Sequence, residues 1–167
     1  VLKDMKRNIT MQQTQDLVDK IRERVPNIAL RTTMLTGFPT ESEQDFEMLC
    51  AFIEKNRFDR LGVFTYSHEE NTSAHKFEDI WDDEEKNYRQ LTLMEIQSGI
   101  SYELNQNKIG QTFKVILDRT ENGIYYGRTE FDSPEVDNEV VITTENYLRL
   151  GDFVDVTITD ATEFDLE

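Results

Sequence analysis

The sequence predicts two architectures in series: an α/β segment over residues 1–103 and a small all-β domain over residues 104–167. Helix and strand patterns alternate in the first segment, which is typical of parallel βα units. After Gly110, apolar residues recur at every second position, and an Asn-Gly turn separates two of the resulting strands. The 167 residues include 37% hydrophobic side chains, 10 Phe, 6 Tyr and 1 Trp, which is enough for a packed core.

The first segment is expected to contain three helices and two strands. Thr10 and Gln13 form a capping box before a helix that ends at Pro26, and Thr40 and Glu43 form a second capping box. Gly37 closes the first strand. The expected elements are a helix after Thr10, a strand over 28–36, a helix after Thr40, a strand over 61–66, a polar loop over 67–79 and a long helix over 82–108.

The second segment is expected to be a small barrel. Its strands cover residues 112–118, 124–129, 139–143, 152–159 and 163–166, and the turn over residues 121–123 joins the first two. A closed, OB-like barrel is the natural arrangement because closure removes the sheet edges. The boundary between the two segments lies near residues 104–110.

A two-stranded parallel sheet that helices cover on one face is not fully buried. Parallel sheets normally have more strands and are covered on both faces. We therefore expect residues 1–103 to be a piece of a larger α/β sheet or barrel whose front portion is absent from this chain.

Charge and cysteine content restrict the function further. The net charge is −16, and residues 101–167 hold 15 acidic side chains against 5 basic ones. This balance disfavours RNA and favours a basic protein partner, although an acidic surface that only confers solubility is the simpler alternative. The single cysteine, Cys50, excludes an intramolecular disulfide and a metal cluster held by several cysteines of this chain. No apolar run approaches a membrane span and no signal peptide is visible, so a cytoplasmic, membrane-free protein is expected.

Three stretches, taken in order, point to a family. They are LRTTMLTGFPTESEQDF (30–46), FDRLGVFTYSHEENTSA (58–74) and GRTEFDSPEVDNEVVI (127–142). Together they resemble the C-terminal part of radical-SAM methylthiotransferases, and most of all the branch that modifies an aspartate of a small-subunit ribosomal protein. The resemblance implies the C-terminal portion of a radical-SAM (βα) barrel over residues 1–103 and a TRAM domain, an OB-like β-barrel, over residues 104–167. The family pattern GFPGET stands here as GFPTES (37–42), with Thr40 in place of a glycine.

The resemblance also implies cofactors: S-adenosylmethionine and two [4Fe–4S] clusters in the full-length enzyme. The clusters require several cysteine thiolates, and those cysteines are absent here. Cys50, on an apolar helix face, is interpreted as a small buried hydrophobe. We therefore expect this chain to be inactive by itself and to contain no metal ligands.

Barrel enzymes place their chemistry at the C-terminal ends of strands. By position, the residues expected on the S-adenosylmethionine side are Arg31, Thr33, Leu35, Gly37, Phe64, Tyr66 and Ser67. A core or outward-facing role is the alternative for each of them. His68 follows a strand end and is the candidate for acid–base or substrate contact. Metal binding by His68 and His75 is not expected, because their spacing matches no helix-borne metal motif and loops are normally polar.

In the β domain, we expect the loop rich in carboxylates to dock a basic ribosomal protein of the small subunit. The candidate contacts are Tyr126, Arg128, Glu130, Asp132, Glu135, Asp137 and Glu139. Three alternatives remain at this point: a MiaB-type tRNA methylthiotransferase, a stand-alone RNA-binding OB-like module, and an acidic interaction domain without an enzymatic parent. The acidity of the β domain disfavours the first two.

Overall fold

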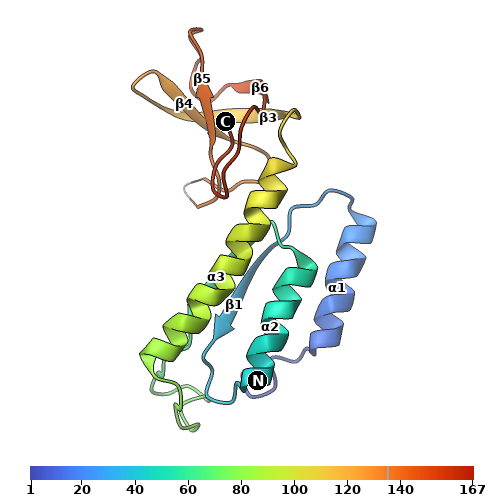
Figure 1. Cartoon of the computed structure of the whole chain (residues 1–167), viewed down its shortest axis with the longest axis vertical. Helices are drawn as coiled ribbons and strands as arrows, with labels where there is room; N and C mark the ends of the chain where they lie inside the picture. Colours follow the sequence, from blue (N-terminus) through green and yellow to red (C-terminus); the bar gives the residue numbers. More distant parts are fainter. Residues whose placement is uncertain (135) are drawn as a thin grey trace. The chain divides into compact units, whose positions relative to one another are not determined.

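A computed structural model describes residues 1–134 and 136–167 of the chain. The chain divides into two compact units, Val1–Gln97 and Ser98–Glu167, which are described separately below. The helices are α1 (Met11–Arg24), α2 (Glu43–Asn56) and α3 (Asp83–Gln106). The strands are β1 (Arg31–Thr36), β2 (Arg60–Thr65), β3 (Thr112–Glu121), β4 (Ile124–Arg128), β5 (Val140–Thr143) and β6 (Phe153–Thr157) (Figure 1).

The first unit is a parallel pair of strands packed against helices. β1 and β2 pair in parallel, as the alternation of helices and strands predicted, and their register runs from Arg31–Arg60 to Thr36–Thr65. Figure 1 shows α1 and α2 running side by side next to β1. One apolar cluster joins these elements; its buried members are Val18, Phe52 and Phe58, with Leu30, Met34 and Leu61 packed against them.

Buried or half-buried side-chain amides fix the helices of this unit to one another and to β2. The Gln15 and Asn56 side chains exchange two hydrogen bonds of 2.9 and 3.0 Å between α1 and α2. On α3, the amide of Gln90 donates to the backbone oxygen of Val63. These bonds satisfy polar groups that would be costly to bury alone.

The helix starts were predicted with mixed success. The capping box of Thr10 and Gln13 is confirmed. The predicted capping box of Thr40 and Glu43 is wrong, because α2 begins two residues later than predicted, with Ser42 and Asp45 as its capping box. Thr40 instead donates to the carboxylate of Asp4 at 2.8 Å. The first strand is also shorter than predicted and begins at Arg31.

The second unit is a four-stranded antiparallel sheet in the order β5-β4-β3-β6. The full closure predicted from the sequence is not seen among the described strands, because β5 and β6 stand at opposite ends of this order and do not pair. The predicted turn between β3 and β4 is confirmed, with Asn122 and Gly123 both at positive φ. The predicted strand over residues 163–166 is wrong: only Leu166 forms bridges, with Val140 and Ala161. The cause is a local turn, in which the Thr162 hydroxyl accepts hydrogen bonds from the backbone of Phe164 and Asp165.

The core of the second unit lies on one face of this sheet. Its buried members are Val115, Val140, Ile158, Ala161 and Leu166. Gly127 allows β4 to approach β3 closely, because a Cβ at that position would lie 2.4 Å from the carbonyl oxygen of Ile116. Only glycine fits this crossing without moving the backbone of β3.

Replacing Gly127 by Ala is expected to destabilise the protein by about 1–3 kcal/mol, because the added methyl group meets backbone that cannot yield cheaply. The matched control is Gly99→Ala on α3, where nothing lies within 4 Å of the added Cβ. Removing a helical glycine there should stabilise the protein by up to about 1 kcal/mol. Chemical unfolding of both variants measures the two effects, and equal midpoints would contradict the close packing of β3 and β4.

Candidate functional site

The C-terminal end of β1 is held by one buried carboxylate. Glu41 Oε1 accepts hydrogen bonds from the Thr36 hydroxyl at 2.9 Å and from the backbone N–H of Gly37 at 3.1 Å. Glu41 and Thr36 are both buried. The turn that follows β1 therefore has a fixed geometry, which is what a binding loop at a strand end requires.

Arg89 of α3 pairs with the Glu41 carboxylate and balances its negative charge. Its guanidinium is fully buried and donates to Glu41 at 2.8 Å and to Glu85 at 2.7 Å, and it also pairs with Glu43. The guanidinium carbon lies 3.9 Å from the centre of the Trp81 ring. Burial by itself lowers the pKa of Arg89, but the hydrogen bonds to Glu85 and Glu41 outweigh burial and leave that pKa raised.

Gly37 lies against a second buried cation. Its φ of +74° suits glycine, and a Cβ there would lie 2.6 Å from Cγ of Lys86. The Lys86 ammonium pairs with Asp79 at 2.6 Å and lies 5.6 Å from the centre of the Tyr66 ring. The turn after β1 is thus fixed by α3 at two points, Lys86 and Arg89.

The end of β2 is an aromatic cluster. Phe38 contacts both Tyr66 and Phe77 edge to face, with ring centres 5.1 and 5.9 Å apart. The Tyr66 hydroxyl lies 3.3 Å from Nδ1 of His68, and the centres of the His68 and His75 rings lie 4.5 Å apart, with the ring planes tilted by 36°. Burial, and then the charge of Asp79, raise the pKa of Tyr66. His68 therefore faces a phenol that stays protonated at neutral pH.

The two histidines do not form a metal site with their neighbours. Within residues 1–134 and 136–167, no three His, Cys, Asp or Glu side chains are grouped so that they could hold a metal ion. Ser67 is also engaged locally, since its hydroxyl donates to Glu69 at 2.6 Å.

The predicted cofactor residues fall into two groups. Arg31, Thr33 and Leu35 stand at every second position of β1 and therefore share one face of the strand. Phe64 of β2 is the register partner of Leu35. This face is open: Arg31 and Thr33 are exposed, and 63% of Phe64 is accessible. Gly37 and Tyr66 are buried at the strand ends instead, and Ser67 is exposed beyond them.

These residues differ in how well they suit the implied cofactors. The open face combines a cation with apolar surface, which suits a nucleoside that carries a carboxylate, as S-adenosylmethionine does. A [4Fe–4S] cluster does not fit the residues present, because it needs several thiolates. Cys50 is the single thiol and is half-buried on α2. Burial and the charge of Glu54 raise the pKa of this thiol, which disfavours the thiolate needed for ligation.

In the second unit, most of the predicted docking carboxylates have partners within the unit. Glu139 pairs with Arg119, which stacks on the Tyr126 ring at 3.9 Å. Asp132 is buried and accepts from the Thr129 hydroxyl, and Asp137 accepts from the backbone of Ser133. Arg128 lies 3.1 Å from Asp118. Glu130 is exposed, and Glu135 lies outside the described residues.

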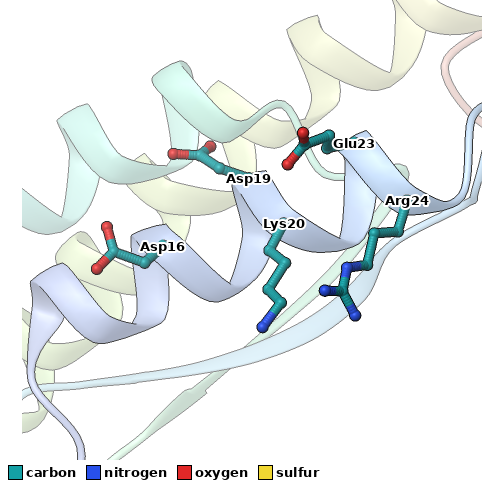
Figure 2. Close-up of a pocket in the computed structure, with 5 residues that line it drawn as sticks. All are labelled: Asp16, Asp19, Lys20, Glu23 and Arg24. Atoms are coloured by element: carbon teal, nitrogen blue, oxygen red, sulfur yellow. The ribbon is translucent and has the colours of Figure 1, made fainter.

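A shallow depression on α1 is lined only by charged side chains of that helix. They are Asp16, Asp19, Lys20, Glu23 and Arg24. Figure 2 shows Lys20 and Arg24 pointing to one side of α1 and Asp19 and Glu23 to the other. A mixed-charge surface of a single helix is ordinary solvated surface, and we assign no function to it.

Comparison with known proteins identifies the second unit and the family. A family model described as the TRAM domain matches residues 109–167. Proteins named "Ribosomal protein uS12 methylthiotransferase RimO" are 57% identical in Cytophaga hutchinsonii and 52% identical in Flavobacterium psychrophilum, each over 99% of this chain. The relative of the same name in Chlorobaculum tepidum is 49% identical. The chain belongs to the RimO methylthiotransferase family.

The chain spans 38–39% of the length of these RimO relatives. The resemblance found in the sequence is therefore confirmed at the level of the family, and the presence of a TRAM domain is confirmed over residues 109–167. No helix in the described part of the chain is long and apolar enough to cross a membrane.

Sequence reasoning missed Glu41 and Arg89, which hold the strand end together. A signal was present: Arg89, Leu93, Gln97 and Ile100 recur at helical spacing and are all buried. A cation on the buried stripe of a helix requires a carboxylate partner. That pattern identifies Arg89 but does not identify which of the 34 acidic side chains pairs with it.

Replacing Arg89 by Leu is expected to destabilise the protein by about 3–5 kcal/mol, because the buried Glu41 carboxylate loses its counter-charge. Arg119→Leu is a matched control. Arg119 also binds two carboxylates and stacks on an aromatic ring at 3.9 Å, but its side chain is 40% exposed. Solvent screens that pair, so its loss should cost far less.

Urea unfolding of the two variants provides the comparison. The double variant Glu41→Gln/Arg89→Leu should lose less stability than the sum of the two single changes, because the pair is removed together. Equal losses for Arg89→Leu and Arg119→Leu would show that burial of the first pair has no energetic consequence.

Proposed function

We propose that this chain is the C-terminal part of an enzyme that transfers a methylthio group to an aspartate side chain of ribosomal protein uS12. The observation that carries the proposal is the identity of 57% over 99% of the chain to a relative named for that activity. S-adenosylmethionine and two [4Fe–4S] clusters are the cofactors of the full-length enzyme. The reaction takes place in the cytoplasm, where ribosomal proteins are found.

In this proposal the two units have different roles. The first unit contributes the end of a radical-SAM barrel, and the open face with Arg31, Thr33, Leu35 and Phe64 faces S-adenosylmethionine. The fixed turn at Gly37 supports that position, because Glu41 and Arg89 leave it little freedom. His68 and its partner Tyr66 lie at the neighbouring strand end, where substrate contact is expected.

The TRAM domain docks the protein substrate in this proposal. Residues 101–167 carry 15 acidic and 5 basic side chains, a balance that attracts a basic protein and repels RNA. The predicted loop contributes through its exposed carboxylate, Glu130, more than through Asp132 and Glu139. Those two groups are used within the domain.

The docking role predicts that the whole chain binds purified uS12 more tightly than tRNA at about 0.1 M salt. The affinity for uS12 should fall as the Debye length shortens from about 10 Å at 0.1 M to about 3 Å at 1 M. Calorimetric titrations of the two ligands at equal concentration measure the preference. Tighter binding to tRNA would reject the uS12 assignment and favour the tRNA-modifying branch.

Two charge-reversal variants locate the attraction. Glu130→Lys/Glu145→Lys changes exposed carboxylates of the TRAM domain, and Glu23→Lys/Glu47→Lys makes the same charge change on exposed positions of α1 and α2. The first variant should bind uS12 at least about tenfold more weakly, because it places positive charges on the domain that is proposed to attract the basic partner. The second should bind as the unmodified chain does; equal losses would mean that only total charge matters.

The chain itself is expected to hold no iron–sulfur cluster. Anaerobic incubation with iron and sulfide should leave no stoichiometric absorption band near about 400 nm after desalting, because one half-buried thiol cannot ligate a cluster. Cys50→Ser is the control and should give the same spectrum. A bound cluster in the unmodified chain that is lost in Cys50→Ser would contradict the expected inactivity of this part of the enzyme.

A further inference from the structure

Among the described residues, strand β6 has an unused backbone edge over Phe153–Thr157; just past the strand, Thr159 and Asp160 bond to the backbone of Glu167. The strand lies at the end of the sheet β5-β4-β3-β6 and pairs with β3 alone among the named strands. At one end of this pairing, the backbone N–H of Leu117 donates to the backbone carbonyl oxygen of Asp152. At the other end, the backbone N–H of Ile158 donates to the backbone carbonyl oxygen of Gln111. Both bonds turn the even-numbered residues of the segment toward β3.

The odd-numbered residues therefore turn their backbone groups to the open side of the sheet. These residues are Phe153, Asp155 and Thr157. Within the described residues, no backbone hydrogen bond outside the β3–β6 ladder uses their N–H or C=O groups. Such an edge is a template for one more strand, and peptide recognition by strand addition uses edges of this kind.

The side chains beside this edge suit a protein ligand. Phe153 is 65% exposed, and the loop before β6 presents Tyr147, which is 86% exposed. That loop is held in place, because the backbone of Leu148 donates to the Tyr125 hydroxyl and Gly151 makes a turn at φ +85°. Exposed aromatic side chains on a fixed frame are typical anchors of protein interfaces.

The charge around the edge selects the partner. Residues 150–167 contain six acidic side chains and no Lys or Arg. Arg119 and Arg128, which form ion pairs in this unit, lie outside that segment. Asp155 stands in the middle of β6, so a second copy of β6 would bring like charges together. A Lys- and Arg-rich strand would bring opposite charges together instead.

We propose that β6 accepts an extended, Lys- and Arg-rich segment of the protein substrate as an added strand. The segment bonds to the outward backbone groups of Phe153, Asp155 and Thr157, and its side chains lie beside Phe153 and Asp155. This inference rests on the proposed function for the identity of the partner. Nucleic acid cannot extend a sheet by amide hydrogen bonds, and its phosphates meet the carboxylates unfavourably.

Amide exchange resolved by NMR tests the added strand on the whole chain with purified uS12. On binding, the amides of Phe153, Asp155 and Thr157 should become protected. The amides of Val154 and Val156 already face β3 and should change little. Binding without protection of the three outward amides would overturn the proposal and leave the proposed function intact.

Substitutions at one position separate the backbone from the charge. Asp155→Pro removes an outward N–H from an edge strand, where proline is tolerated, and should weaken uS12 binding at least about tenfold through lost amide bonding. Asp155→Asn keeps the N–H and should weaken binding less. If Asp155→Pro fails to fold, the exchange pattern of the unmodified chain decides the question.

A matched pair of substitutions tests Phe153 as an aromatic anchor of the interface. Phe153→Ser should weaken uS12 binding, whereas Leu91→Ser on α3, where the side chain is similarly exposed at 68%, should not. Equal affinities of Asp155→Pro, Phe153→Ser and the unmodified chain would overturn the proposal. A chain that binds tRNA but not uS12, with the same amides protected, would overturn both this proposal and the proposed function.

Discussion

The buried pair of Glu41 and Arg89 constrains the first unit more than any other interaction. One oxygen of Glu41 receives donors from the end of β1, from the turn after it and from α3. A buried carboxylate in such a position cannot move without losing all three bonds, and a buried guanidinium cannot lose its counter-charge cheaply. The strand end, the start of α2 and the first turns of α3 therefore form one rigid body.

This constraint leaves the opposite face of the β1–β2 pair open. Met34 and Leu61 point into the apolar cluster, whereas Arg31, Thr33 and Phe64 point away from it. Parallel sheets are normally covered on both faces. Under the proposed function, the rest of the longer protein and S-adenosylmethionine cover this face. The polar and apolar mixture on it is consistent with a ligand rather than a second apolar layer.

Features set by neighbouring residues were predictable from the sequence. The Thr10 cap and the Asn122-Gly123 turn depend on residues three or fewer positions apart, and both are confirmed. The start of α2 was mispredicted because Thr40 and Ser42 are both good caps. Asp4, which binds Thr40, lies 36 residues away in the sequence, so the choice depends on tertiary contacts.

The functional residues show the same limit. The family, the TRAM domain and the strand ends could be predicted from local motifs, but the partner of Arg89 lies 48 residues away. The number of carboxylates in the loop predicts a docking role for it, but their partners cannot be predicted from that number. The sequence does not show that Arg119 binds Glu139, or that Asp132 is buried against Thr129. The orientation of β6 likewise depends on its register with β3.

Residues 101–167 contain five Lys and Arg side chains. Their positions, more than the number of carboxylates, determine which part of this region is most acidic. All five precede residue 150, and Arg119 and Arg128 form ion pairs with carboxylates between residues 118 and 139. The acidic side chains after residue 150 have no cation of their own segment to balance them. Since an exposed field decays within about a Debye length, a basic partner is attracted most strongly to this C-terminal segment. That segment contains β6, so the attraction and the open backbone edge coincide.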